Sequence, residues 1–207
     1  MPIDLQQLLA PAHTAVVTME LQRGVVGDLS PMRELADEAA AQRVVENASR
    51  LVRAARAAGA KVVHCTAEFR ADGSGAALNA PLLAAIAKRG QNMIVGTEHI
   101  ELMPELGPEP TDVVSARMHG LTPFPGTELD AILRNLGVRT IVATGCSLNV
   151  GVLGLVMGAV DHGYRVAIVT DAVAGIPREY GEALLNNTFA VLATRVTTDE
   201  VLATWKD

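Results

Sequence analysis

Aromatic residues and cysteines are both scarce in this chain of 207 residues. Phe, Tyr and Trp together make up only 3% of it, so a densely packed core has to be built mainly from Ala, Val, Leu and Ile. The two cysteines, Cys65 and Cys146, are too few for a disulfide framework and are typical of a reducing compartment. We therefore expect a cytoplasmic protein.

Clusters of basic residues and long apolar runs are missing as well. The formal net charge is −6, which argues against a nucleic acid or an anionic membrane as the partner. The start, Met1–Asp4, has neither the basic residues nor the apolar core of a signal peptide. No apolar run approaches the roughly 18 residues of a membrane helix. A small molecule is therefore the expected partner.

Metal ligands are not grouped in the sequence either. The five histidines, at positions 13, 64, 99, 119 and 162, do not combine with carboxylates in any recognisable ligand spacing. We predict no metal and no other cofactor.

Short extended apolar runs alternate with helical patterns along the whole chain. Such alternation predicts βαβ units, and hence a three-layer α-β-α Rossmann-like fold with a central parallel sheet of about six strands. No linker or repeat interrupts residues 1–207, so we expect one domain. Strands are predicted at residues 13–19, 61–66, 112–115, 138–144, 165–170 and 193–197, and helices at 39–58, 81–88, 127–136, 150–162, 178–191 and from Thr198 onward; Thr127 and Asp130 form a capping pattern.

The carboxyl ends of parallel strands are where such sheets bind ligands. The first predicted strand runs directly into Glu20, whose carboxylate has to be paired or protonated if it is buried, and otherwise caps backbone N–H groups in a solvated loop. The third strand leads to Arg117, which stays charged and can bind a carboxylate, hold Glu20 ionised or lie on the surface. His119 beyond it is either an acid or base, or structural.

The segment from Gly145 to Gly151 reads as the end of a strand, a tight loop and the start of a helix. Free N–H groups at a helix start favour negative charge, so this is a second candidate edge of a site. A nucleophilic enzyme is expected to carry Cys or Ser on the first helical turn, and this chain has Gly151 there. Cys146 lies on the loop instead, as a reactive thiol or as a small buried residue.

These segments carry a resemblance to a known family. Glu20-Leu21-Gln22, then residues 112–117 and 124–129, then 144–152 and 163–172, resemble the isochorismatase-like hydrolases in order and spacing, over about residues 13–203. The resemblance implies a Rossmann-like sheet of about six parallel strands and, in most members, an Asp-Lys-Cys triad for amidase chemistry. The triad positions fall on Glu20, Arg117 and Gly151, so a carboxylate and a cation remain while the nucleophile is absent.

True isochorismatases are similar to this chain in having Gly at the cysteine position. That similarity implies hydrolysis of an enol ether without a covalent intermediate, in which the first-strand carboxylic acid protonates the vinyl carbon and water attacks the oxocarbenium. Glu20 is one methylene longer than the usual Asp, so the proton is delivered from a different place and the substrate differs accordingly.

The resemblance also implies which residues surround the substrate. We expect Glu20, Arg117 and Gly151 at the catalytic positions. Glu68 and Arg70 either contact the substrate or pair with each other at the surface. The substrate contacts expected are Gln22, Glu68, Met118, His119, Phe124, Cys146, Ser147 and Leu148, with Gly120 and Leu121 in the same pocket wall.

Family relatives are commonly dimers or tetramers, so a homodimer or homotetramer is expected. The small residues of the helix that contains Gly154 and Gly158 suit either contact between subunits or packing of the helix inside one subunit.

Three functions follow as alternatives. The first is a hydrolase for a small carboxylate-bearing metabolite, in which Glu20 is a general acid and Arg117 binds the substrate carboxylate. The second is a non-catalytic relative that keeps the pocket for ligand binding, and the third is a thiol amidase that uses Cys146. The first is preferred because a carboxyl group and a cation survive at matched positions. An ion pair between them favours an ionised carboxylate, which works against a general acid.

Overall fold

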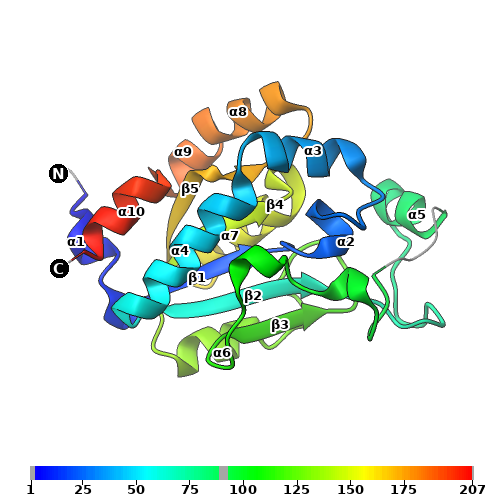
Figure 1. The fold of residues 1–207 in the computed structure, drawn as a ribbon, viewed down its shortest axis with the longest axis horizontal. Coiled ribbons are helices and arrows are strands. Elements are labelled where there is room, and N and C mark those ends of the chain that lie inside the picture. Colours follow the sequence, from blue (N-terminus) through cyan, green and yellow to red (C-terminus); the bar gives the residue numbers. More distant parts are fainter. Residues whose placement is uncertain (1–2, 89–92, 207) are drawn as a thin grey trace.

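Six parallel strands form one sheet in the computed structural model, which describes residues 3–88 and 93–206. The strand order is β3-β2-β1-β4-β5-β6, and every neighbouring pair is parallel. The predicted parallel sheet in a three-layer arrangement is therefore confirmed (Figure 1). The strands are β1 (Thr14–Met19), β2 (Lys61–Ala67), β3 (Val113–Arg117), β4 (Thr140–Cys146), β5 (Arg165–Ala174) and β6 (Thr194–Val196).

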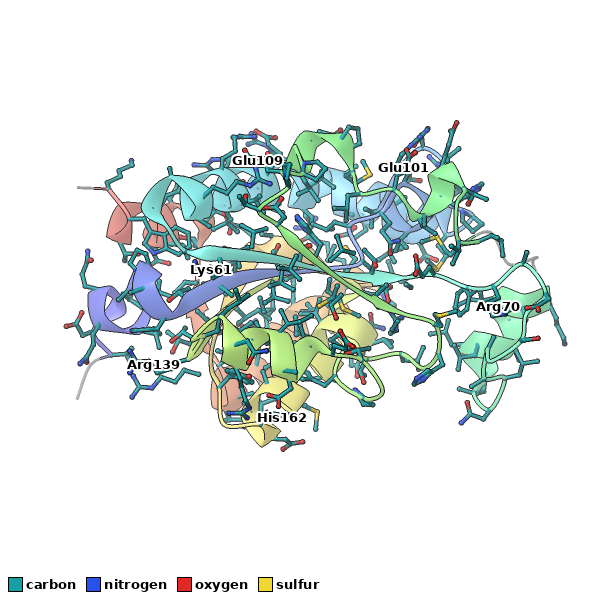
Figure 2. The ribbon with its side chains drawn as sticks, turned by 90° about the horizontal axis from the view of Figure 1, so that it is seen from below. Lys61, Arg70, Glu101, Glu109, Arg139 and His162 are labelled. Carbon is teal, nitrogen blue, oxygen red and sulfur yellow. The ribbon has the colours of Figure 1, made fainter. Side chains whose placement is uncertain are left out.

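Helices cover both faces of the sheet, so its central strands are buried on both sides. Val16 of β1 packs with Leu51 on the face covered by α4 (Val44–Ala58), whereas its neighbour Val17 packs with Leu155 on the face covered by α7 (Leu153–Asp161). Continuous rather than alternating burial is typical of a parallel strand between two helical layers. Figure 2, turned by 90°, shows the strands between these layers, with Lys61 and Arg70 toward opposite ends of β2.

The predicted helix over residues 39–58 was wrong in its extent, because the chain forms two helices there. Helix α3 (Arg33–Ala41) ends before Arg43, whose φ of 55° places it in the left-handed region, and α4 then begins at Val44. Neither Pro nor Gly marks this break in the sequence. Two short helices, α1 (Leu5–Leu8) and α2 (Arg23–Val26), were not predicted.

Three further helices differ in their limits. Helix α6 (Leu129–Asn135) begins after Glu128, whose side chain makes no capping bond. Of the predicted capping residues, Thr127 lies one residue before Glu128 and accepts a bond of 3.2 Å from the Leu129 N–H, and Asp130 pairs with Arg134. Helix α7 is preceded by a π-helical turn at Leu148–Val152. The predicted helix 178–191 is divided into α8 (Arg178–Asn186) and α9 (Phe189–Leu192); α5 (Pro81–Lys88) lies where it was expected.

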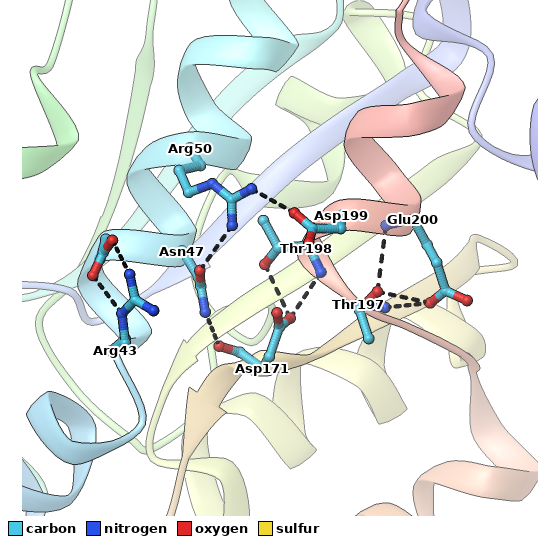
Figure 3. Close-up of polar contacts among 9 residues, drawn as sticks. Arg43, Asn47, Arg50, Asp171, Thr197, Thr198, Asp199 and Glu200 are labelled. Carbon is cyan, nitrogen blue, oxygen red and sulfur yellow. Dashed lines mark hydrogen bonds and ion pairs between the residues drawn. The ribbon is translucent and has the colours of Figure 1, made fainter.

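The last helix, α10 (Thr198–Thr204), starts as predicted and is held by Asp171 of β5. Asp171 Oδ1 accepts bonds of 2.8 Å from the Thr198 N–H and 2.9 Å from Thr198 Oγ1, and the Asp171 carbonyl accepts from Asn47 Nδ2 of α4 (Figure 3). Thr197 and Glu200 add a reciprocal capping box. These contacts fix α10 beside α4, on the same face of the sheet.

The glycines of α7 make room for another segment of the same chain. A Cβ on Gly154 would lie 2.0 Å from Thr122 Cγ2, and one on Gly158 would lie 2.7 Å from Phe124 Cδ2. Packing within one subunit therefore accounts for both glycines, and the homo-oligomer stays a prediction. Within residues 3–88 and 93–206, no helix is long and apolar enough to cross a membrane.

Candidate active site

The carboxyl ends of β1 to β4 lie at one edge of the sheet. The strand order reverses there, between β1 and β4. From β1 the chain continues outward to β2 and β3, and it returns to the other side of β1 for β4. Such a switch point leaves a crevice between the strand ends. Gly145 of β4, at a φ of 116°, brings the two strands close together: a Cβ there would lie 2.2 Å from the Met19 carbonyl oxygen.

A cavity of about 570 Å³ lies at this edge, within the size range of small-molecule sites. Helices α2, α3 and α5 contribute to its wall, and α2 and α5 lie beyond the ends of the strands in Figure 1. Four of the eleven predicted site residues line it: Glu20, Arg117, Ser147 and Gly151. The other lining residues are Gly24, Val25, Pro31, Met32, Arg33, Glu34, Leu35, Ala67, Phe69, Leu82, Leu83, Ile86, Met93, Gly120, Leu121, Asn149, Val150 and Ile176.

Glu20 enters this cavity from a constrained turn. Its φ of 51° is uncommon for any residue other than glycine, and such a conformation costs of order 1 kcal/mol. The backbone bond from the Glu20 N–H to the Cys65 carbonyl, at 2.9 Å, ties the turn to the neighbouring strand. The carboxylate is therefore held at the strand end.

The side chain of Gln22 holds the same turn through hydrogen bonds to the backbone. Its Nε2 donates to the carbonyls of Ala67 at 3.0 Å and Ile100 at 2.8 Å, and its Oε1 accepts from the Ala67 N–H at 2.8 Å. The side chain is fully buried and does not line the cavity. Its hydrogen bonds make it a positioning residue for Glu20, in place of the expected substrate contact.

Arg117 ends β3 and pairs with Glu20 through Nη2 and Oε1. The two side chains are only 8% and 14% exposed, respectively, so water screens the pair weakly. Arg117 Nε points to the Gly120 carbonyl at 3.4 Å, and Nη1 is buried without a hydrogen-bond partner among the described residues. The predicted juxtaposition of Glu20 and Arg117 is thus present, and the guanidinium keeps one unused donor group.

Gly151 lies in the π-helical turn, and the space beside it is already filled. An ideal Cβ at this position would lie 2.9 Å from Met19 Cε and 3.2 Å from Met19 Cγ. Met19 itself is fully buried. A cysteine therefore does not fit at position 151 unless Met19 moves. The Met19 side chain occupies the space that a nucleophilic side chain at this position would need.

Cys146 ends β4 and does not line the cavity. It is fully buried in an apolar cluster with Leu21, Ala174 and other side chains, and burial raises the pKa of its thiol to about 12. A thiol with such a pKa is almost entirely protonated near neutral pH, and the thiolate is the nucleophilic form. Cys146 was interpreted either as a reactive thiol or as a small buried residue, and its burial agrees with the second interpretation.

The remaining predicted contacts lie outside the cavity lining. Phe124 is buried and stacks on His162 at a centroid distance of 4.8 Å, and Leu148 belongs to the apolar core. Met118 and His119 are exposed, although Gly120 and Leu121 beside them do line the cavity. Glu68 is half-buried outside the cavity, and Arg70 pairs with Asp72 rather than with Glu68.

Several lining residues were missed by the sequence reasoning, chiefly those of α2, α3 and α5. They are ordinary apolar side chains such as Leu35 and Leu83, and nothing in the sequence separates them from core residues. Leu35 falls in the helix that was predicted to start only at residue 39. The order of elements along the chain contains no signal that these helices close over the strand ends.

A series of buried polar side chains in contact with one another lies on the face of the sheet that α4 covers. Thr18 Oγ1 and His64 Nδ1 are 2.7 Å apart, and His64 Nε2 lies 3.4 Å from Asp112 Oδ2, which also pairs with Arg56. Burial lowers the pKa of His64. No group of three or more His, Cys, Asp or Glu side chains in the described part of the chain is placed to hold a metal ion.

Known proteins share this arrangement across nearly the whole chain. Residues 14–200 match the isochorismatase domain family. An uncharacterised isochorismatase family protein of Bacillus subtilis, YwoC, is 32% identical over 190 residues, covering 91% of this chain and 92% of that protein. A ureidoacrylate amidohydrolase, RutB, of Agrobacterium fabrum is 28% identical over 180 residues, covering 79% and 77% respectively.

Among solved structures, an isochorismatase family protein from Burkholderia thailandensis superposes with a TM-score of 0.78 and 28% identity, covering 95% of this chain and 97% of that one. The family match spans every strand of the sheet and both strand ends that carry Glu20 and Arg117. The chain therefore belongs to the isochorismatase family, and it is a hydrolase of that family.

Proposed function

We propose that the protein hydrolyses a small carboxylate-bearing metabolite by non-covalent general-acid chemistry, with Glu20 as the acid. The observation that carries this proposal is the pairing of Glu20 with Arg117 at the wall of the cavity that Gly151 also lines. A carboxyl group and a cation are thus available at one place, with no thiol between them.

The reaction that suits these residues is hydrolysis of an enol ether. The protonated Glu20 gives its proton to the vinyl carbon, and the electron pair of the double bond forms the new C–H bond. Water then adds to the resulting oxocarbenium carbon, and the hemiketal collapses to an alcohol and a carbonyl compound. Arg117 holds the substrate carboxylate beside this centre as a fixed charge.

An amidase mechanism through Cys146 is less well supported. Curated relatives include amidohydrolases such as RutB, but a thiol attack needs a thiolate that faces the substrate. Cys146 is fully buried, lies outside the cavity lining and has a pKa of about 12. The non-catalytic alternative, a protein that binds ligands without turning them over, shares the same pocket and is separated from the hydrolase by an assay of turnover.

The test uses 2-phenoxyacrylate, an enol ether that carries a carboxylate and yields phenol and a 2-oxo acid on hydrolysis. We expect turnover by the wild-type protein and a loss of about 10²–10⁴-fold in kcat/KM for Glu20→Gln, the range by which a positioned general acid contributes. In D₂O the product methyl group should gain one deuterium, because the acid delivers its proton to carbon.

Glu20→Asp should retain part of the activity, because it keeps the carboxyl group. Glu105→Gln is a matched control on an exposed carboxylate outside the cavity lining, and it should behave as the wild type does. Full activity of Glu20→Gln would exclude the general-acid role. Binding of the probe without product after long incubation would support the non-catalytic alternative.

A further inference from the structure

The guanidinium of Arg117 has an unused hydrogen-bonding group inside the cavity wall. Nη2 contacts Glu20 and Nε contacts the Gly120 carbonyl, while Nη1 is buried without a partner among the described residues. Buried charged donors in folded proteins nearly always have acceptors. Arg117 lines the cavity and its side chain is only 8% exposed, so a ligand that displaces a neighbouring side chain is a suitable acceptor for this group.

The charges around this guanidinium balance only while the cavity holds no anion. Two further charged residues line the cavity, Arg33 and Glu34, and both are exposed at the start of α3. The buried part consists of Glu20 and Arg117, one charge of each sign. A carboxylate ligand on Arg117 adds a second negative charge beside Glu20.

Groups on the adjacent strands do not compensate that added charge. Cys65 of β2 and Cys146 of β4 are the titratable neighbours of Glu20 on those strands, and both thiols are fully buried. Burial raises the pKa of each to about 12, so both are neutral near pH 7. When two carboxylates share one weakly hydrated site, their repulsion strongly raises the pKa of one of them.

We propose that a carboxylate ligand displaces Glu20 from Arg117 and that Glu20 takes up one proton from solvent as the ligand binds. The inference rests on the proposed function and supplies its missing step. The net charge of the buried site is conserved, because one anion and one proton enter together. Nη1 and Nη2 are then both free to bind the two ligand oxygens in the bidentate manner that guanidinium groups favour.

This exchange explains how a carboxylate paired with arginine can act as an acid. Without ligand, Glu20 is the partner of Arg117; with ligand, it carries a proton and lies beside the substrate.

The lining of the cavity also narrows the chemical class of the ligand. Besides Arg117, the wall consists mostly of apolar side chains, so the ligand has one carboxylate and an apolar body; those side chains include Phe69, Leu83, Ile86, Met93, Leu121 and Val150.

Benzoate is a probe of this class, and isothermal titration calorimetry measures the proton directly. Titrations at one pH in buffers of different ionisation enthalpy give the number of protons taken up per benzoate bound. We expect about one proton for the wild type near neutral pH, where a free carboxylate is ionised. By linkage, the Kd for benzoate should rise about tenfold per pH unit wherever uptake is complete.

Two variants of Glu20 separate the proton from the fold. Glu20→Gln should bind benzoate with no proton uptake and with a Kd that does not change with pH, because its amide cannot titrate. Glu20→Asp should retain the uptake. Arg117→Met should lose benzoate binding, and benzamide, which is neutral, should bind the wild type without taking up a proton.

Benzoate binding without proton uptake, or uptake that persists in Glu20→Gln, would overturn the inference, and so would an absence of benzoate binding to the wild type. Failure of the proposed function gives a different result. In that case 2-phenoxyacrylate gives no product with the wild type, or Glu20→Gln turns it over as well as the wild type does, whatever the calorimetry shows.

Discussion

Gly151→Ala tests whether the site has been repacked around its missing nucleophile. Replacing glycine by alanine in a helix usually stabilises a protein by about 1 kcal/mol. Here the new Cβ would lie 2.9 Å from Met19 Cε, 3.2 Å from Met19 Cγ and 3.3 Å from the Cys146 carbonyl oxygen. Overpacking of a filled core costs about 1–3 kcal/mol, so we expect a net loss of about 1 kcal/mol in the free energy of unfolding.

Urea denaturation followed by circular dichroism measures this loss. Gly181→Ala in α8 is the matched control, because its Cβ would meet nothing closer than Leu148 Cδ2 at 3.5 Å, and it should gain stability by about the helix-propensity difference of ~1 kcal/mol. Met19→Ala combined with Gly151→Ala should show a favourable coupling of about 1 kcal/mol in a double-mutant cycle. Equal gains from Gly151→Ala and Gly181→Ala, or a coupling of zero, would refute the packing argument.

Three further outcomes follow from burial and packing. Iodoacetamide should leave Cys146 unmodified in the native protein and label it in urea, as peptide mass spectrometry would show, because burial raises its pKa to about 12. The wild type should lose unfolding free energy as the pH falls below about 6.5, because the unfolded chain protonates His64 while burial lowers its pKa in the folded state; urea titrations at pH 7.5 and 5.5 should show a smaller loss for His64→Gln. Gly154→Ala should cost about 1–3 kcal/mol in the same urea assay, because its Cβ would lie 2.0 Å from Thr122 Cγ2, and unchanged stability would contradict that contact.

The sequence predicted the sheet better than it predicted the helices. Apolar runs between helical patterns identify buried parallel strands, and all six predicted strands overlap β1 to β6. The single helix predicted over residues 39–58 failed because a left-handed residue, Arg43, divides α3 from α4 where the sequence has neither Gly nor Pro. Helical periodicity continues across such a break, so the pattern does not reveal it.

For the candidate site, the positions of the residues could be predicted from the sequence, but the directions of their side chains could not. Strand ends of a parallel sheet share one edge, and for this reason Glu20 and Arg117 could be brought together from the sequence. The direction of each side chain could not be predicted, because it depends on contacts from distant segments. Gln22 turns inward to the backbone of Ala67 and Ile100, and Cys146 turns into the core.

By itself, the sequence determined the order of the strands, and with it the edge of the sheet where a carboxylate, a cation and a glycine in place of a nucleophile come together. These are properties of local pattern and chain order. Only the tertiary structure decided that Met19 fills the space beside Gly151, that α2, α3 and α5 close an apolar wall over the strand ends, and that Arg117 keeps one donor group unused. The physical reason is that each of these features is a contact between residues far apart in the chain, and local periodicity carries no information about such contacts.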